Sequence, residues 1–391
     1  MSTRISFSSI NTRILDRLYQ NYNKLEGIQQ QIASGKKVDR PSDDPVAVSN
    51  SMELRTQIDQ FKSFQRNIDD GLAYLGTVDT TLTTGNALYQ NMRERAIQAS
   101  NDSNSAESRM FIGREVRGMF DQMVALANTA FKGEYIFSGT NTQVAPYEIR
   151  NGRSQAFAAA PSGGNLQLTA ADLGTLSATK RLADLNITDS TQTSGYADAY
   201  HIIPGTVVCA GLTEGTDFTV DYVQGSVTFL TMNAVTLAAT GPGIDMRYDW
   251  LRRNEKDLDG VVNREVEEGV TARMNTTATE VYGSNDENTS WEAMINLLEG
   301  TFRNDPAKIR SSITKIDASM TRSLSAQAMN GSRVLRFEST QSRNEERTVY
   351  STQLQSDVED VDFAEAVSQF QLQQAVYEAS LKMGARAIQN T

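Results

Sequence analysis

The residues that most often perform chemistry in proteins are scarce in this sequence. It contains one histidine, His201, and one cysteine, Cys209. One cysteine excludes an intrachain disulfide, and the two residues are too few for a histidine- or cysteine-rich metal site. No G-x-S-x-G nucleophile motif accompanies His201, so packing is its simplest role. Cys209 stands among valines and an alanine and is predicted to be a small buried apolar residue.

Carboxylates offer a second route to chemistry. Asp43 and Asp44 could act as a general acid–base pair, but Pro45 follows them directly. An aspartate before a proline is typical of an N-cap and the first residue of a helix, so capping explains this pair more simply. The polar segment 284–289 lacks the spacing of an EF-hand calcium loop and is predicted to precede a helix.

An enzyme in the middle of the chain would have to use Asp217, Asp221 and Asp245. The sequence has neither a phosphate-binding P-loop nor a dinucleotide-binding glycine pattern. We therefore expect no enzymatic activity, no catalytic residue, no cofactor and no metal. The sequence is better interpreted as that of a structural or binding protein.

The N-terminal end follows a heptad pattern that is typical of a coiled coil. Its apolar residues are spaced 4, 7, 3 and 4 apart, with Asn21 in one of the seam positions: Ile14, Leu18, Leu25, Ile28 and Ile32. Gly35 is predicted to end this helix. A second helix is expected from Pro45 to about Ser100, and a third from Ser105 to about Phe131, followed by a short strand over 135–137.

The C-terminal part is helical again. Helices are predicted from about Thr289 and from Asp305–Pro306, the latter continuing past Gly331. The last stretch carries a seam with alternating spacings of 4 and 3: Phe363, Val367, Phe370, Gln374, Tyr377, Leu381, Gly384 and Ile388. A heptad helix at each end implies that the two ends of the chain pair with each other.

The segment between the helices differs in composition. Residues 153–250 are poor in charge and rich in Gly, Thr, Ser and Ala, and they contain strand patterns over 217–230, around a glycine turn, and over 244–250. The fold class is therefore mainly α with a β-rich insert. We expect an elongated rod, in which the terminal helices form a coiled coil, long antiparallel helices form an inner domain and the insert lies at the distal end.

This pattern divides the chain of 391 residues into five segments. Residues 1–44 and 346–391 would form the two halves of a terminal coiled-coil domain, and 45–150 and 255–345 the two halves of an inner helical domain. Residues 151–254 would form the inserted outer domain.

Charge and hydropathy restrict the partners. The net charge of −11 argues against nucleic-acid binding, because no positive field attracts phosphate. No segment has the roughly 20 apolar residues of a membrane-spanning helix, so membrane insertion is not expected. The first residues lack the apolar core of a cleaved signal peptide, so export would need another route.

Several motifs resemble the bacterial flagellin family. QIASGKKV at 31–38 and RPSDDPVA at 40–47 resemble the N-terminal signature of the family. GEYIFSG at 133–139 is similar to the members that join the hook to the filament, as are NRE at 263–265, EVYG at 280–283 and GSR at 331–333. The segment 358–367 resembles the start of the family's C-terminal helix. The resemblance covers residues 1–150 and 255–391.

The resemblance implies a structural adaptor of the bacterial flagellum that joins the hook, through the first hook-associated protein, to the flagellin filament. It further implies export by the flagellar type III apparatus to an extracellular position without a cleaved signal peptide. The implied partners are other copies of the chain, the first hook-associated protein, flagellin, and an export chaperone that covers the C-terminal seam. The alternatives are a filament flagellin and a secreted, adhesin-type binding protein.

The predicted functional residues form two sets. The assembly interface comprises Ile14, Leu18, Leu25, Ile28, Ile32, Phe363, Val367, Phe370, Tyr377, Leu381 and Ile388. The family's signature turn comprises Arg40, Pro41, Ser42, Asp43, Asp44 and Pro45.

Overall fold

The computed structural model describes most of the helical sequence and part of the insert. The described residues are 7–38, 40, 44–156, 179–181, 201–209, 212–223, 225–229, 244–253, 258–284 and 289–389. Within them, no helix combines the length and the apolar character needed to cross a membrane.

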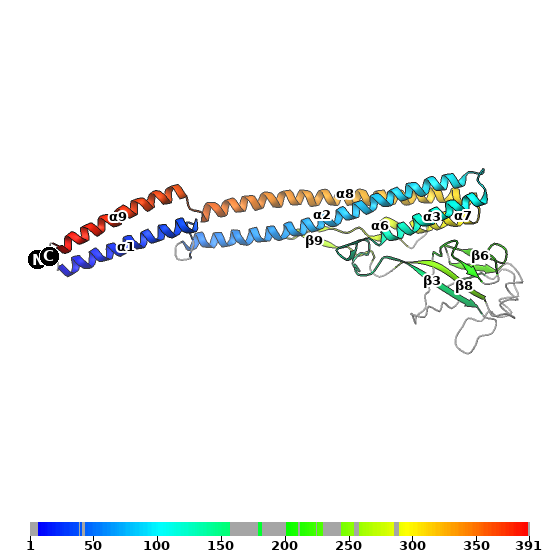
Figure 1. Ribbon diagram of the computed structural model, residues 1–391, viewed down its shortest axis with the longest axis horizontal. Coiled ribbons are helices and arrows are strands. Elements are labelled where there is room, and N and C mark those ends of the chain that lie inside the picture. Colours follow the sequence, from blue (N-terminus) through cyan, green and yellow to red (C-terminus); the bar gives the residue numbers. More distant parts are fainter. Residues whose placement is uncertain are drawn as a thin grey trace, which may run out of the picture. The chain divides into compact units, whose positions relative to one another are not determined.

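The described helices confirm the expected order of elements (Figure 1). They are α1 (Phe7–Ser34), α2 (Pro45–Ser100), α3 (Ala106–Ala127), α6 (Ala278–Tyr282), α7 (Ser290–Phe302), α8 (Pro306–Glu359) and α9 (Phe363–Gln389). The protein is mainly helical with small β-sheets, as the sequence predicts.

Aspartate caps begin three of the long helices. Asp44 accepts hydrogen bonds from the backbone N–H groups of Val46 and Ala47, both at 3.0 Å. Asp305 caps α8 and Asp362 caps α9 in the same way. Each carboxylate satisfies N–H groups that have no partner inside the helix and also favours the positive end of the helix dipole. The capping interpretation of Asp44 is therefore confirmed.

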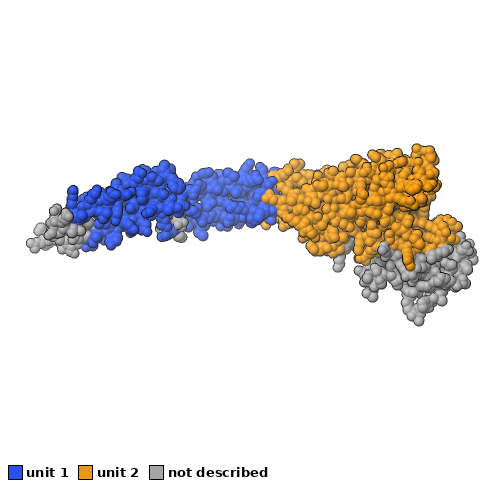
Figure 2. All heavy atoms as spheres, in the orientation of Figure 1, with its two compact units in different colours: residues 1–68, 266–268, 339–391 blue, residues 69–265, 269–338 orange. Residues whose placement is uncertain are grey.

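The chain divides into two compact units (Figure 2). The first unit comprises residues 1–68, 266–268 and 339–391, and the second comprises residues 69–265 and 269–338. The helices α2 and α8 each contribute to both units.

A strict heptad of buried residues runs along α8. Its members are seven residues apart and nearly inaccessible to solvent: Ile309, Ile316, Ser323, Asn330, Phe337, Asn344 and Ser351. In the first unit Asn344 donates to the backbone carbonyl of Phe61 at 2.9 Å, and in the second Asn330 donates to that of Leu75 at 3.0 Å. A buried asparagine amide that donates to a carbonyl of the neighbouring helix favours one register, so the two residues help to fix how α8 pairs with α2.

The core of the second unit is an aromatic cluster. The Trp291 ring on α7 stacks on Tyr282 with ring centroids 5.0 Å apart and lies 4.6 Å from Tyr147. Phe120 on α3 meets the same ring edge to face at 5.8 Å. These rings are almost fully buried, and large buried aromatic rings dominate the energetics of a core.

Short antiparallel sheets make up the rest of the second unit. The strands are β1 (Ala130–Phe131), β2 (Glu134–Tyr135), β3 (Tyr147–Ala156), β4 (Thr179–Arg181), β5 (Val208–Cys209), β6 (Phe218–Asp221), β7 (Ser226–Phe229), β8 (Ile244–Arg253), β9 (Asn263–Glu267) and β10 (Val270–Arg273). Two three-stranded sheets have the orders β3-β8-β5 and β4-β7-β6. The expected β6–β7 hairpin is confirmed, with Gly225 in the left-handed conformation between the strands.

One boundary differs from the sequence prediction. The third helix ends at Ala127 instead of near Phe131, and in place of the short strand expected over 135–137 the structure has β2 at Glu134–Tyr135, which pairs with β1. Lys132 and Gly133 both have positive φ, 53° and 86°, which is the backbone of a tight hairpin turn. This turn reverses the chain early, so Ile136 and Phe137 become core residues.

Candidate assembly interface

The two terminal helices pair antiparallel in the first unit. On α1 the residues that face α9 are half-buried: Leu18, Asn21, Leu25, Ile28 and Ile32. The Asn21 amide donates to the Ser380 hydroxyl at 3.0 Å, and the Gln373 amide donates to the Asn21 carbonyl at 3.3 Å. A polar residue inside a coiled-coil seam specifies register at a cost in stability. The pairing of the chain ends that the heptads imply is therefore present.

The seam on α9 is offset from the predicted stripe. Its least exposed residues alternate by 4 and 3: Ala366, Phe370, Gln373, Tyr377, Ser380 and Gly384. Of the predicted stripe, Phe370, Tyr377 and Gly384 lie in this seam, and Tyr377 contacts Tyr22 with ring centroids 6.1 Å apart. The smaller residues Ala366 and Gly384 are buried because they allow α1 to approach closely.

The other predicted residues of α9 lie outside the seam. Phe363 is 55% exposed, Val367 is 42% exposed and Leu381 is 44% exposed. The side chains of Ile14 and Ile388 fall outside the described part of the structure. Residues spaced 3 and 4 apart can lie on two adjacent faces of a helix. The predicted stripe therefore covers more of the α9 surface than the part that contacts α1.

Exposed apolar side chains therefore flank the seam on both of its sides. We call this set of side chains the terminal face, and its members are Leu15, Tyr19 and Tyr22 on α1, and Phe363, Val367, Leu372, Val376, Leu381 and Met383 on α9. Tyr19, Leu372 and Met383 are each about two-thirds exposed or more, at 67%, 68% and 73%. So many large apolar side chains exposed on one helix pair exceed the single exposed apolar residues that are normal on a monomer, and such an accumulation marks an interaction site.

The signature turn is described only in part. Pro45 is the first residue of α2 and Asp44 is its N-cap. Arg40 is described and has an interaction partner. Pro41, Ser42 and Asp43 lie outside the described residues.

The remaining motif residues hold the second unit together. The Asn275 side chain, 1% exposed, accepts from the Val262 N–H at 3.0 Å and donates to the Gly260 carbonyl at 2.7 Å. Glu280 completes a capping box with Thr277 at the start of α6 and forms an ion pair with Arg273 at 2.9 Å. These residues fix local turns, so the motifs that resemble the family are explained by folding.

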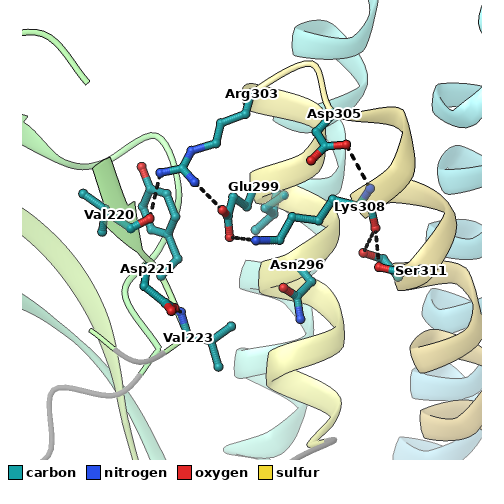
Figure 3. A network of polar contacts seen from close by, with 12 residues as sticks. Val220, Asp221, Val223, Asn296, Glu299, Arg303, Asp305, Lys308 and Ser311 are labelled. Carbon is teal, nitrogen blue, oxygen red and sulfur yellow. Dashed lines mark hydrogen bonds and ion pairs between the residues drawn. The ribbon is translucent and has the colours of Figure 1, made fainter. Parts of the chain in front are cut away.

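A polar network joins the insert to the helices of the second unit (Figure 3). Glu299 on α7 is buried and forms ion pairs with Arg303 at 2.5 Å and Lys308 at 2.6 Å. Arg303 also reaches Glu214 and the carbonyl of Val220, each at 2.7 Å. Burial lowers the pKa of Arg303, but Glu214 and Glu299 more than offset this effect, so the pKa is raised.

The residues considered for chemistry have structural surroundings. Cys209 is buried in β5. Asp217 accepts from the Thr213 N–H and Asp221 from the Val223 N–H, which are bonds within turns. Burial lowers the pKa of His201 to about 4, and the nearby Glu292 offsets only part of this shift. Among the described residues, no three histidine, cysteine, aspartate or glutamate side chains gather in a way that could hold a metal ion.

Sequence reasoning missed two sets of residues that carry this architecture. The first is the pair Asn330 and Asn344, and the signal for it was present, because they stand two heptads apart in line with Ile309 and Ile316. The second is the polar network of Glu299, which lies on a helix otherwise full of buried apolar residues. Arg303 and Lys308 follow Glu299 closely, but Glu214 and Val220 are distant in sequence, so no local pattern indicates the complete network.

A pair of terminal helices with exposed apolar side chains, together with long helices and a β-rich insert, is the set of elements that the resemblance to flagellins implies. Residues 5–142 match the family described as the bacterial flagellin N-terminal helical region. The resemblance inferred from the sequence motifs is therefore confirmed.

Individual relatives narrow this class. The chain is 30% identical to flagellar hook-associated protein 3 of Escherichia coli over 125 residues, which is 32% of this chain and 39% of that protein. It is 26% identical to a flagellin of Clostridium tyrobutyricum over 228 residues, which is 58% of each. The matches thus span about two-fifths and just under three-fifths of the length of these relatives.

A solved structure supports the fold. A protein described as a flagellar hook-associated protein from Vibrio parahaemolyticus aligns with 81% of this chain and 100% of its own, with a TM-score of 0.50 and 17% identity. At this identity the likeness concerns the fold alone.

Proposed function

We propose that this chain is a structural adaptor of the bacterial flagellum that joins the hook to the flagellin filament. The observation that carries the proposal is the terminal face, a set of exposed apolar side chains on a helix pair whose own seam is mostly half-buried. The relatives supply the class of assembly, because both hook-associated protein 3 and flagellins match the chain.

The geometry of the terminal pair favours assembly over a free monomer. The seam between α1 and α9 contains Asn21, Gln373 and Ser380, which hydrogen-bond across it but add little apolar burial. Burying apolar area is worth about 25 cal/mol per Å², so covering the terminal face with neighbouring copies would supply the stability that the seam lacks. In the assembled state the terminal helices would form the axial layer of a tube.

The five segments predicted from the sequence have corresponding roles in this proposal. Residues 1–44 and 346–391 would form the axial layer, 45–150 and 255–345 the surrounding helical layer, and 151–254 the solvent-facing insert. The partners would be other copies of the chain, the first hook-associated protein, flagellin and an export chaperone. The chain would work outside the cell, after export without a cleaved signal peptide, and without enzymatic activity.

A filament flagellin is the second candidate, and the match to a flagellin over 58% of this chain favours it. The two functions predict different behaviour when the purified chain is added to filament seeds. A filament subunit elongates filament seeds without limit, whereas a junction subunit adds a limited number of copies and then stops.

Deletion of the gene in its source bacterium tests the proposal. We expect hooks without filaments in electron micrographs and unassembled flagellin in the medium. Intact filaments in the deletion strain would contradict the junction role.

Complementation of that strain tests the terminal face. We expect Leu372→Asp to be secreted but not to restore filaments, because a charge would have to be buried between copies. Gln371→Asp introduces the same group at an exposed polar neighbour on α9 and should restore filaments. Equal restoration by both variants would show that the terminal face takes no part in assembly.

A further inference from the structure

Three charged side chains among the described residues are buried: Arg109, Glu299 and Glu359. Arg109 ties the turn between α2 and α3 to Asn304, and Glu299 belongs to the network that holds the insert. Glu359 is the member of this group in the first unit. It lies at the end of α8, and the helix packing of α8 does not require a charge there.

Glu359 is surrounded by donors from two other elements. Its Oε1 is 2.5 Å from Arg55 Nη2 on α2, and its Oε2 is 3.3 Å from Lys36 Nζ in the turn after α1. The Ser51 hydroxyl on α2 also donates to Oε1. The Glu359 side chain is only 6% exposed, whereas Arg55 and Lys36 reach it from the surface at 49% and 36% exposure.

This position is electrostatically unfavourable for a carboxylate. Glu359 is the last residue of α8, where the helix dipole is negative and favours cations. Burial away from water adds a further cost for an ionised group. The two cations and the hydroxyl offset both costs only while Lys36, Arg55 and Ser51 stay in place, so the ionised carboxylate selects one arrangement of these three elements.

Backbone hydrogen bonds next to Glu359 connect the turn after α1 with the turn before α9. The Lys37 N–H donates to the Glu359 carbonyl at 2.6 Å, and the Val361 N–H donates to the Gly35 carbonyl at 3.0 Å. Lys36 and Asp360 form an antiparallel bridge between these bonds. The turn that ends α1 and the turn that leads into α9 are therefore hydrogen-bonded to each other beside the Glu359 carboxylate.

We infer that Glu359 is a positioning residue for assembly. Its carboxylate holds the turn 35–37, the start of α2 and the turn 360–362 together, so that the α1–α9 pair presents the terminal face in one geometry. This inference rests on the proposed function and adds a residue whose side chain is buried within its own chain.

Glu359→Gln tests the inference, because glutamine keeps the shape and the acceptor for Ser51 but removes the charge. Breaking a buried ion pair is strongly destabilising, so we expect hydrogen exchange at the Lys37 and Val361 amides to accelerate about tenfold or more. Amides of α7 in the second unit should keep their protection. Incorporation into flagella should fall about tenfold at equal secretion.

Glu346→Gln is the matched control, since it is the same substitution at an exposed position of α8. It should leave both exchange and incorporation unchanged. If Glu359→Gln is degraded in the cell, the double variant Lys36→Gln with Arg55→Gln removes the two cations on the exposed side of the cluster and leaves the buried carboxylate unpaired. We expect the double variant to show the same two effects.

Incorporation of Glu359→Gln at the level of the unchanged chain, or unchanged exchange at Lys37 and Val361, would overturn the inference while leaving the proposed function intact. Absence of the unchanged chain from flagella would instead overturn the proposed function, and the inference with it.

Discussion

The aromatic cluster around Trp291 and the seam between α1 and α9 are both contacts between helices, but they bury very different amounts of surface. Trp291, Phe120 and Tyr147 are at most 3% exposed. In the terminal pair, Ala366 is the single apolar side chain of α1 and α9 that is buried among those described. The second unit therefore has a core of its own, whereas the terminal pair in the first unit has only a seam.

This difference in burial suggests that the second unit is stabilised by its own core and that the terminal pair is suited to assembly. Full burial of a large apolar side chain is worth about 1.5–3 kcal/mol, so the aromatic cluster stabilises the second unit without partners. The terminal pair instead relies on Asn21, Ser380 and Gln373 for register and leaves its apolar residues outside. In the proposed assembly, neighbouring copies would cover these helices and stabilise them, and such ordering on binding would keep subunits from polymerising early.

The largest loss of stability is expected from a substitution in the aromatic cluster. Phe120→Ala should lower the free energy of unfolding of the second unit by about 4 kcal/mol, because it leaves a cavity against Trp291. Phe111→Ala removes the same ring from the same helix at a position that is 56% exposed and should cost about 0.5 kcal/mol or less. Denaturant unfolding measures both values, and similar losses would mean that the cluster is not the core.

The next largest loss is expected from a substitution in the seam between α1 and α9. Phe370→Asp places a charge against α1 and should cost several kcal/mol of helix pairing. The variant should be a soluble monomer that is secreted but not incorporated into flagella, while the melting of the second unit stays unchanged. Circular dichroism and electron microscopy measure these outcomes. Normal incorporation of Phe370→Asp would count against a role of the seam in assembly.

Protonation of His201, which lies in the insert, is expected to lower the free energy of unfolding by up to about 3 kcal/mol. The pKa of His201 is lowered to about 4 from 6.5, so the unfolded chain binds a proton at a pH where the folded chain does not. Stability should therefore fall as pH decreases from about 6.5 to about 4.

His201→Asn isolates this contribution, because asparagine does not titrate and tolerates the left-handed backbone of this position, where φ is 68°. Unfolding free energies at pH 7 and pH 4 should differ less for the variant than for the unchanged chain. The same pH dependence in both proteins would assign the acid sensitivity to other groups.

The smallest changes in stability are expected from substitutions of two glycines in α2. A Cβ at Gly71 would collide with the buried Phe337 ring, whereas a Cβ at Gly76 would meet nothing within 4 Å. Gly71→Ala should destabilise by about 1–2 kcal/mol through overpacking. Gly76→Ala should stabilise by about 0.5–1 kcal/mol through helix propensity. Thermal unfolding gives both signs, and a stabilising Gly71→Ala would show that α2 and α8 are less closely packed at this point.

Local patterns in the sequence predict most of the helical architecture. The aspartate–proline pairs at 44–45 and 305–306 locate the starts of α2 and α8, and the heptads at the two ends predict that the ends pair. The seam of α9 was harder to locate, because Phe363 and Val367 have the same spacing as residues that do face α1. Apolar periodicity reports every face that avoids water, and it does not distinguish a contact within one chain from a contact between chains.

The two buried ion-pair clusters could not be predicted, because each one depends on at least one partner that is distant in sequence. Glu359 meets Lys36 and Arg55 some three hundred residues away, and Glu299 is linked to Glu214 through Arg303. Each of these residues has an ordinary local sequence. Only the fold shows that the carboxylate is buried and therefore requires its partners.

The central claim is that the terminal pair is marginally stable alone and becomes buried on assembly. Hydrogen exchange of α1 and α9 measured in the isolated chain and in flagella tests it most directly. We predict exchange in the isolated chain that is much faster in α1 and α9 than in α7, and strong protection of both terminal helices after assembly. Equal protection of α1 and α9 in the two states would contradict the account.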